Sequence, residues 1–236
     1  PKCGIARIIA DPRGGEAIMN SLAALLPAGS AVLVLGAHCD DVEIGAGGML
    51  ATLSHARPDL RIVWRVFSAE AGRAEETAAA ARRLLPGATV DLEVAGFHGS
   101  HFPADWTGIK AALEALKPLR PALVLTHCRG DLHQDHRVIH ELTWNTFRDH
   151  LILEYEIPKF DGDLGQPNAF FPLSREQLDR KVALLMDCFP SQRGRGWFTP
   201  ETFIALARIR GIECAAPEGY AEAFYLRKAR LQFGAA

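Results

Sequence analysis

Residues 32–36 form a short, unbroken apolar run that ends in glycine and leads straight into a polar turn. A run of this length, rich in β-branched residues, is typical of a strand that is buried on both faces, as in a parallel sheet. The turn brings together one imidazole and two adjacent carboxylates, His38, Asp40 and Asp41. Because ligands collect where the strands of an open parallel α/β sheet end, we expect this turn to form part of a functional site.

Strand-like and helix-like patterns alternate from residue 31 to about residue 150. After the first strand, the patterns predict strands at 61–67, 89–94 and 122–126, and helices at 49–56, 75–85 and 106–116. This alternation predicts an α/β fold: a Rossmann-like, mostly parallel sheet with helices on both faces.

The pattern loosens after residue 150. A strand is predicted at 151–157, a long loop at 158–172, and helices at 174–188 and 200–210; a further helix is predicted near the start, at 16–26. Ser174 and Gln177 have the spacing of a capping box. No repeat or linker divides the chain, so we expect one domain over residues 1–236, with a motif-bearing core at about 31–150 and a loop, helices and a closing strand in 151–236.

Composition argues against several partners. The formal net charge of −2 offers no basic field for a nucleic-acid backbone. No segment has the uninterrupted apolar length that a membrane-spanning helix requires. The five cysteines are scattered and include no C-x-x-C pair, so neither a disulfide framework nor a thiolate zinc site is indicated. We expect a cytoplasmic protein, and we leave a homo-oligomer open as an alternative to a monomer.

A second polar cluster follows the predicted strand 122–126. If the two strands are near neighbours, both clusters face one crevice, and the chain then presents six candidate groups there: His38, Asp40, Asp41, His133, Asp135 and His136. Two histidines and one carboxylate with an open fourth position are the ligands of a catalytic zinc ion. Only some of the six can be ligands, and the remainder are then available for proton transfer beside the metal.

Each group also has a structural interpretation. A lone histidine is more often a hydrogen-bonded structural residue, and His127 either orients a metal ligand or is only hydrogen-bonded at the end of its strand. Asp40 and Asp41 alone could cap the helix that follows. The combination favours a metal, because two adjacent like charges are costly unless a cation neutralises them.

The stretch 37–45, Ala-His-Cys-Asp-Asp-Val-Glu-Ile-Gly, together with His133-Gln134-Asp135-His136, resembles the PIG-L/LmbE-like family of metal-dependent N-deacetylases. The resemblance covers about residues 31–150, with weaker likeness at 70–83 and 219–224. It implies a hydrolase that removes an N-acetyl or other N-acyl group from an amino sugar, such as N-acetylglucosamine, or from an amino-sugar conjugate. The implied cofactor is zinc, with ferrous iron as the alternative, and the implied partner is a small molecule.

The resemblance also implies roles for individual residues. The metal ligands it implies are His38, Asp41 and His136. It makes Asp40 the general base and His133 the group that polarises the oxyanion. Asp135 then assists catalysis by orienting an imidazole.

This sequence departs from the family pattern at one position of the first motif. Cys39 replaces the usual proline, and we interpret it as a small apolar filler rather than a ligand. We expect substrate contacts from Arg73, which resembles a sugar-contacting position of the family, and from a lid built from Arg193, Arg195 and Trp197.

Two other functions fit parts of the pattern. A non-haem iron enzyme uses the same set of two histidines and one carboxylate. A non-catalytic sugar- or nucleotide-binding domain would use the glycines at 45–48 as a phosphate cradle, although their spacing is not G-x-G-x-x-G.

Overall fold

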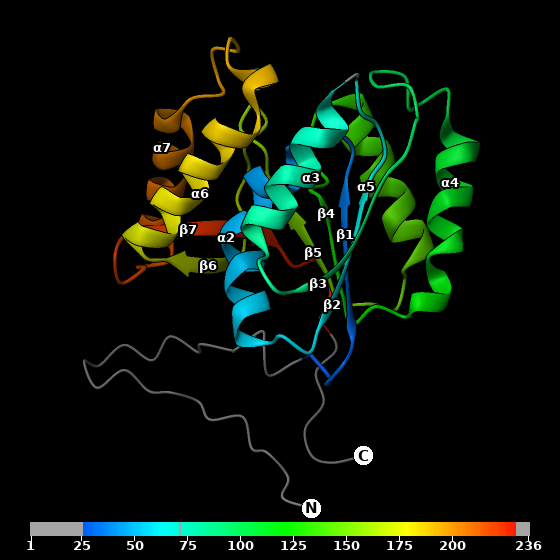
Figure 1. Ribbon diagram of the computed structural model, residues 1–236, viewed down its shortest axis with the longest axis horizontal. Coiled ribbons are helices and arrows are strands. Elements are labelled where there is room, and N and C mark those ends of the chain that lie inside the picture. The colour runs from blue at the N-terminus through cyan, green and yellow to red at the C-terminus, as the bar shows by residue number, and fades with distance from the viewer. Residues whose placement is uncertain (1–25, 71, 230–236) are drawn as a thin grey trace, which may run out of the picture.

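The computed structural model describes residues 26–70 and 72–229 (Figure 1). These residues form one seven-stranded sheet and six α-helices. The helix predicted at 16–26 falls almost entirely outside the described residues. That the whole of residues 1–236 is one domain therefore stays a prediction.

The sheet has the strand order β3-β2-β1-β4-β5-β7-β6. The strands are β1 (Ala31–Gly36), β2 (Arg61–Val66), β3 (Thr89–Val94), β4 (Leu123–His127), β5 (Ile152–Tyr155), β6 (Ala169–Leu173) and β7 (Tyr220–Tyr225). The first five are parallel, whereas β7 runs antiparallel to both β5 and β6. The predicted Rossmann-like, mostly parallel α/β fold is confirmed.

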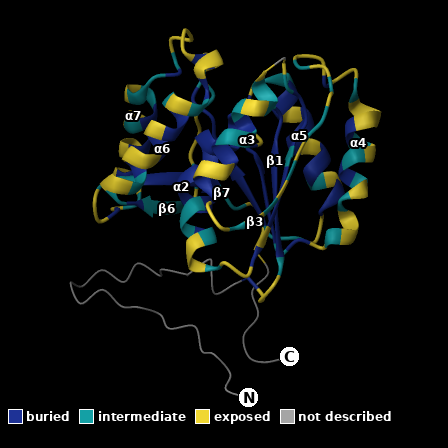
Figure 2. Cartoon of the chain, in the orientation of Figure 1, coloured by how far each residue is buried: buried dark blue, intermediate teal, exposed yellow. Residues whose placement is uncertain are grey.

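Helices cover both faces of this sheet, as predicted (Figure 1). They are α2 (Asp41–Ala56), α3 (Arg73–Leu84), α4 (Trp106–Ala115), α5 (Gln134–Thr146), α6 (Arg175–Cys188) and α7 (Pro200–Glu213), with short 3-10 turns at Lys117–Leu119 and Pro190–Gln192. One apolar core joins the sheet to α2, α3, α6 and α7, and a second core joins its other face to α4 and α5. Figure 2 shows the central strands buried between these helices, whose outer sides are exposed.

Helix α2 begins at Asp41, eight residues before the helical segment predicted from sequence. The glycines at the start of α2 suggested a loop in the sequence, but in the structure they lie against neighbouring side chains. A Cβ atom on Gly45 would lie 2.3 Å from the Tyr155 ring, and one on Gly48 would lie 2.7 Å from a Leu173 methyl group. The glycines thus let α2 pack closely on β5 and β6, and the proposed phosphate cradle at 45–48 is wrong.

The C-terminal part follows the prediction with two differences. Ser174 and Gln177 form the predicted capping box at the start of α6. Helix α7 continues to Glu213 rather than ending at residue 210. The predicted loop at 158–172 contains the start of β6, an edge strand whose proline the sheet tolerates because that edge needs no donor.

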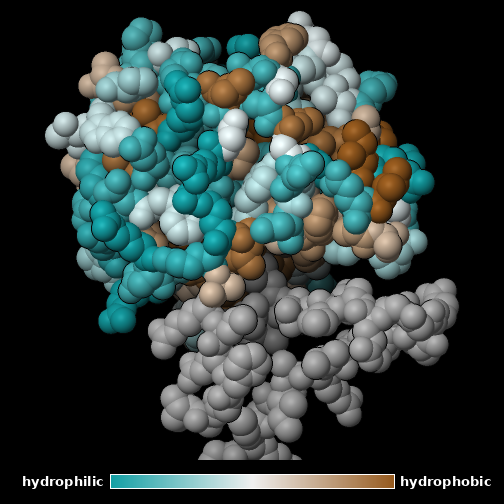
Figure 3. Space-filling model, turned by 180° about the vertical axis from the view of Figure 1, so that it is seen from behind, coloured by the Kyte–Doolittle hydropathy of each residue, from teal (hydrophilic) through white to brown (hydrophobic). Residues whose placement is uncertain are grey.

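The surface is polar over most of the rear face, with apolar side chains gathered on the side where α7 lies (Figure 3). Ile209 and Ile212 of α7 are 51% and 64% exposed. Among the described residues, no helix combines the length and the apolar character needed to cross a bilayer. The oligomeric state stays a prediction.

Candidate metal centre

The two polar turns meet because β1 and β4 are parallel neighbours at the centre of the sheet. From here the strand order runs outward in both directions, through β2 on one side and β5 on the other. Such a switch point leaves a crevice at the carboxyl ends of the strands. The turn after β1 carries His38 and leads into α2, and the turn after β4 leads into α5, so both predicted clusters face one crevice.

Three predicted groups converge in this crevice. His38 Nδ1 lies 3.2 Å from His136 Nε2. The Asp41 carboxylate lies beside both rings, with Oδ2 3.6 Å from His38 Nδ1 and Oδ1 3.5 Å from His136 Nε2. In tetrahedral zinc sites with bonds of about 2.0–2.2 Å, neighbouring ligand atoms stand roughly 3.3–3.6 Å apart. The two imidazole nitrogens are therefore spaced as neighbouring ligands of one small cation, and the Asp41 carboxylate has one oxygen near each of them.

Hydrogen bonds fix which nitrogen of each ring faces the crevice. His38 Nε2 lies 2.9 Å from Asp135 Oδ2, and His136 Nδ1 lies 2.8 Å from Asp131 Oδ2. Each carboxylate accepts a hydrogen bond from its ring, which leaves His38 Nδ1 and His136 Nε2 facing one another. Two lone pairs 3.2 Å apart repel unless a proton or a cation lies between them.

Asp135 is itself held from the loop before α4. It is fully buried and accepts hydrogen bonds from the backbone N–H groups of Ser100 and Phe102 at 2.6 and 3.2 Å. The pKa of Asp135 is lowered: burial opposes this, but the bonds from His38 and from these backbone groups outweigh it. Asp135 is thus held in a position to orient the His38 ring, which is the role expected for it.

Distances alone permit other ligand sets. His38, His133 and His136 have one donor atom each within 4.8 Å of one another, as do Asp41, His127 and His136. His136 belongs to both groups and is thus common to every arrangement of the site.

His127 is poorly suited to bind a metal. Its Nε2 atom already accepts a hydrogen bond of 3.0 Å from the backbone N–H of Ala37. The Tyr155 hydroxyl lies 3.3 Å from the same atom. His127 is completely buried and stacks on His136, with ring centroids 3.9 Å apart. His127 therefore supports one face of the His136 ring, which agrees with its interpretation as a hydrogen-bonded residue at the end of its strand.

The charges of the centre favour cation binding. Burial alone would raise the pKa of Asp41, but the imidazoles of His136, His127 and His38 hold it well below its ordinary value. Burial and the neighbouring His127 lower the pKa of His136 to about 4. At neutral pH, Asp41 is thus a carboxylate and His136 carries a free lone pair, which is the state that a metal requires.

Asp40 is in a different environment. It is almost fully buried at the N-terminus of α2, with a left-handed φ of 105°. Burial and the adjacent Asp41 charge raise its pKa to about 7, while Arg73 opposes the shift. Arg73 Nη2 lies 3.2 Å from Asp40 Oδ1 and also donates to the Cys39 carbonyl. Asp40 is therefore a carboxyl group that can both accept and return a proton near neutral pH.

His133 lies at the mouth of the site, as the N-cap of α5. Its Nδ1 atom accepts a hydrogen bond from the backbone N–H of Asp135 at 3.2 Å. Burial and the neighbouring His38 lower its pKa, so the ring is neutral at pH 7 and carries its proton on Nε2. His133 is thus a donor rather than a base.

The remaining predicted residues differ in their relation to this centre. Cys39 is fully buried with a thiol pKa raised by burial to about 11, which fits an apolar filler. The segment bearing Arg193, Arg195 and Trp197 precedes α7. Arg193 donates to the Met186 carbonyl at the end of α6. No contact between these three residues and the crevice is seen among the described residues, so their substrate role stays a prediction.

Sequence reasoning missed two residues that shape the site. Asp131, which orients His136, also lies 3.1 Å from Lys159 Nζ. Lys159 comes from the loop after β5 and bonds to Asp163 in that loop. Asp131 stood within the second polar cluster, but nothing in its spacing showed that it would face His136 rather than solvent.

The model of the family "GlcNAc-PI de-N-acetylase" (PIG-L) matches residues 33–147, which include both turns of the crevice. Over this segment the chain is similar to the PIG-L family. No protein with a curated description matches the chain.

Several solved structures share the fold of this chain, although their sequences are only 14–20% identical to it. An N,N'-diacetylchitobiose deacetylase from Pyrococcus horikoshii is 17% identical, with a TM-score of 0.62, over 84% of this chain and 83% of that one. The zinc-inhibited form of the teicoplanin deacetylase Orf2 is 14% identical, with a TM-score of 0.63, over 83% and 97%. GalB, a 4-carboxy-2-hydroxymuconate hydratase from Pseudomonas putida, is 20% identical, with a TM-score of 0.67, over 88% and 100%. The fold therefore serves more than one reaction, and the site must decide between them.

Proposed function

We propose that this protein is a metal-dependent N-deacetylase that hydrolyses the N-acetyl group of an amino sugar or an amino-sugar conjugate. One observation carries the proposal: His38 Nδ1 and His136 Nε2 lie 3.2 Å apart beside the Asp41 carboxylate, and the other nitrogen of each ring is bonded to a buried carboxylate. This arrangement is best satisfied by a divalent cation. Similarity to the PIG-L family over residues 33–147 supports the reaction.

The residues His38, Asp41 and His136 would hold the metal, with zinc as our proposed ion and ferrous iron as the alternative. When bound, such an ion lowers the pKa of a water molecule and polarises the substrate carbonyl. Asp135 and Asp131 keep the two imidazoles in the tautomers that this requires.

We assign proton transfer to Asp40. Its carboxylate takes a proton from the attacking water and returns it to the departing amine. A pKa of about 7 suits both steps, because the protonated and ionised forms are then nearly equal in free energy at neutral pH. Arg73 holds Oδ1 of this carboxylate and thereby positions it.

We assign His133 to the developing oxyanion. Its Nδ1 atom is occupied by the N–H of Asp135, so its Nε2–H is the group available for donation. A donor of this kind, aimed at charge that develops in the transition state, is worth about 3 kcal/mol.

The substrate is a small molecule, and Arg193, Arg195 and Trp197 remain our candidates for its outer contacts. Arg73 remains a candidate sugar contact in addition to its bond with Asp40. A cytoplasmic location is also part of the proposal.

The test is amine release from a panel of N-acetylglucosaminides, including nucleotide-linked and lipid-linked forms, with metal content measured on the same samples. We expect about one metal ion per chain, loss of amine release on chelation, and recovery with zinc in the absence of oxygen. A requirement for oxygen would instead support the iron enzyme. Protein that binds no metal, or that releases amine equally well after chelation, would contradict the proposal.

A further inference from the structure

A second cavity, of about 460 Å³, lies along the outer side of α5. Its wall includes Arg129, Arg137, Arg148 and Arg227, together with Trp144 and Glu141. The arginines come from three separate parts of the chain: the turn after β4, helix α5 with the turn at its end, and the segment after β7. Four guanidinium groups therefore surround one cavity in a chain whose formal net charge is −2.

Two of these guanidinium groups are free. Arg129 and Arg137 are exposed, and neither side chain makes a hydrogen bond or an ion pair with any residue in the described ranges. The backbone of Arg129 is nevertheless fixed, because its N–H donates to Glu154 Oε2 at 2.9 Å. Both side chains thus extend from regular or hydrogen-bonded backbone, and their guanidinium N–H groups have no partner among the described residues.

Two residues of the cavity wall, Arg227 and Trp144, are held by several contacts. The Arg227 guanidinium lies over the Trp144 ring, 4.3 Å from its centroid, and its Nη1 atom is 3.4 Å from Glu154 Oε1. The same oxygen of this buried carboxylate accepts a hydrogen bond of 2.6 Å from Trp144 Nε1. Arg227 is therefore held in place, and other N–H groups of its guanidinium remain available to a ligand. Among the described residues of the wall, Glu141 is the one exposed carboxylate.

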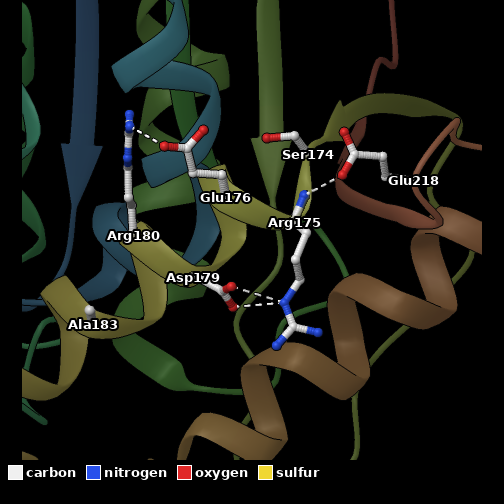
Figure 4. Close-up of a pocket in the computed structure, with 7 residues that line it drawn as sticks. All are labelled: Ser174, Arg175, Glu176, Asp179, Arg180, Ala183 and Glu218. Atoms are coloured by element: carbon white, nitrogen blue, oxygen red, sulfur yellow. Dashed lines mark hydrogen bonds and ion pairs between the residues drawn. The ribbon is translucent and has the colours of Figure 1, made fainter.

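The cavity on the outer side of α6 is a useful contrast (Figure 4). It also contains two arginines, but each is paired within the same helix. Arg175 Nε lies 2.9 and 3.0 Å from the two oxygens of Asp179, and Arg180 pairs with Glu176. Glu218 is also part of that wall. The two arginines of this cavity are thus each paired with a carboxylate, whereas Arg129 and Arg137 beside α5 are not paired with any carboxylate of the described residues.

We propose that the cavity beside α5 binds a phosphate group, carried by a small molecule such as a sugar phosphate or present as the free anion. A phosphate dianion accepts hydrogen bonds on several oxygens at once, and planar guanidinium forks match that geometry. Arg137 directly follows the candidate metal ligand His136, so a phosphate here would lie next to the helix turn that carries the metal centre. The proposal does not depend on the deacetylase assignment, because binding is measured without turnover.

The experiment is isothermal titration calorimetry of the full chain with inorganic phosphate and, separately, with glucose 1-phosphate, at constant ionic strength set with chloride. We expect saturable binding of at least one of them, and the comparison shows whether the cavity prefers the free anion or the ester. In the R129A/R137A variant the dissociation constant should rise about tenfold or more, because two charge-assisted donors are lost.

The matched control is R175A/R180A, which removes the same charge from the paired cavity of Figure 4. Its dissociation constant should stay within about twofold of the wild-type value. Phosphate bound at the metal centre would be common to all three proteins and would cancel from the comparison. Absence of saturable binding, unchanged binding in R129A/R137A, or an equal loss in the control would each overturn the proposal.

A second measurement removes any dependence on the folding of the variants. In the wild-type protein, phosphate should shift the Nε–Hε NMR signals of the arginines that line the cavity. Shifts confined to arginines elsewhere would likewise overturn the proposal.

Discussion

His38 Nδ1 and His136 Nε2 lie 3.2 Å apart although ninety-eight positions separate the two residues in the sequence. The other nitrogen of each ring is hydrogen-bonded to a buried carboxylate: His38 Nε2 to Asp135 and His136 Nδ1 to Asp131. In each ring, one nitrogen is bonded to a carboxylate and the other faces the crevice. This arrangement leads to four predictions.

The ligand set can be tested with two histidines of the same helix end. His136→Ala should reduce bound metal from about one ion per chain to almost none, because His136 is common to every arrangement of donors. His133→Ala should keep its metal and lower turnover by roughly 10²- to 10³-fold, because it removes only the oxyanion donor. Metal analysis by mass spectrometry and steady-state rates provide the readouts. Loss of metal from His133→Ala would instead favour the set His38, His133 and His136.

The division of labour between the two adjacent carboxylates can be tested with isosteric variants. Asp40→Asn should retain metal and lose turnover by about 10²- to 10⁴-fold, because only proton transfer is removed. Asp41→Asn should lose metal as well, because a neutral amide replaces a carboxylate ligand. If Asp40→Asn lost metal stoichiometrically, Asp40 would be a ligand and the assignment would be wrong.

The pH dependence reports on the contact between Arg73 and Asp40. A general base must be ionised, so kcat/KM should fall as pH drops through about 7, where Asp40 becomes protonated. Arg73 favours the ionised form, and Arg73→Gln should therefore raise the pKa of Asp40 and move this acid limb to higher pH. A rise in KM with an unmoved limb would show that Arg73 contacts substrate without controlling Asp40.

Asp131 orients the His136 ring, and this role can be tested by comparing variants of Asp131 and of the nearby Asp163. Asp131→Asn should weaken metal binding by roughly 10- to 100-fold, because the His136 tautomer is no longer fixed. Asp163→Asn removes a carboxylate that also bonds Lys159 but touches neither imidazole, so it is the control. Equal metal affinities in the two variants, measured by competition with a chelator, would show that Asp131 only supports the loop.

Much of this arrangement was predictable because it depends on local pattern and on topology. The apolar runs identified β1 and β4, and polar residues after parallel strands meet at one edge of a sheet. The capping box at Ser174 was equally local. The expected convergence of His38 and His136 followed from these features, which are all properties of short segments.

What could not be predicted depends on contacts between distant segments. The early start of α2 was hidden because Gly45 and Gly48 suggest a loop until their close contacts with Tyr155 and Leu173 are known. Asp131 was missed because its position is set by the direction of α5 and by Lys159, which approaches from the loop after β5. Both cases require the packed structure, since no short stretch of sequence specifies them.

The central claim is that one cation joins the turns that follow β1 and β4. An anomalous difference map from crystals of the zinc-loaded protein, collected at the zinc edge, tests it most directly. We predict one peak about 2.0–2.2 Å from His38 Nδ1, a carboxylate oxygen of Asp41 and His136 Nε2. A map with no peak between these residues, or with the zinc bound only at other side chains, would contradict the account.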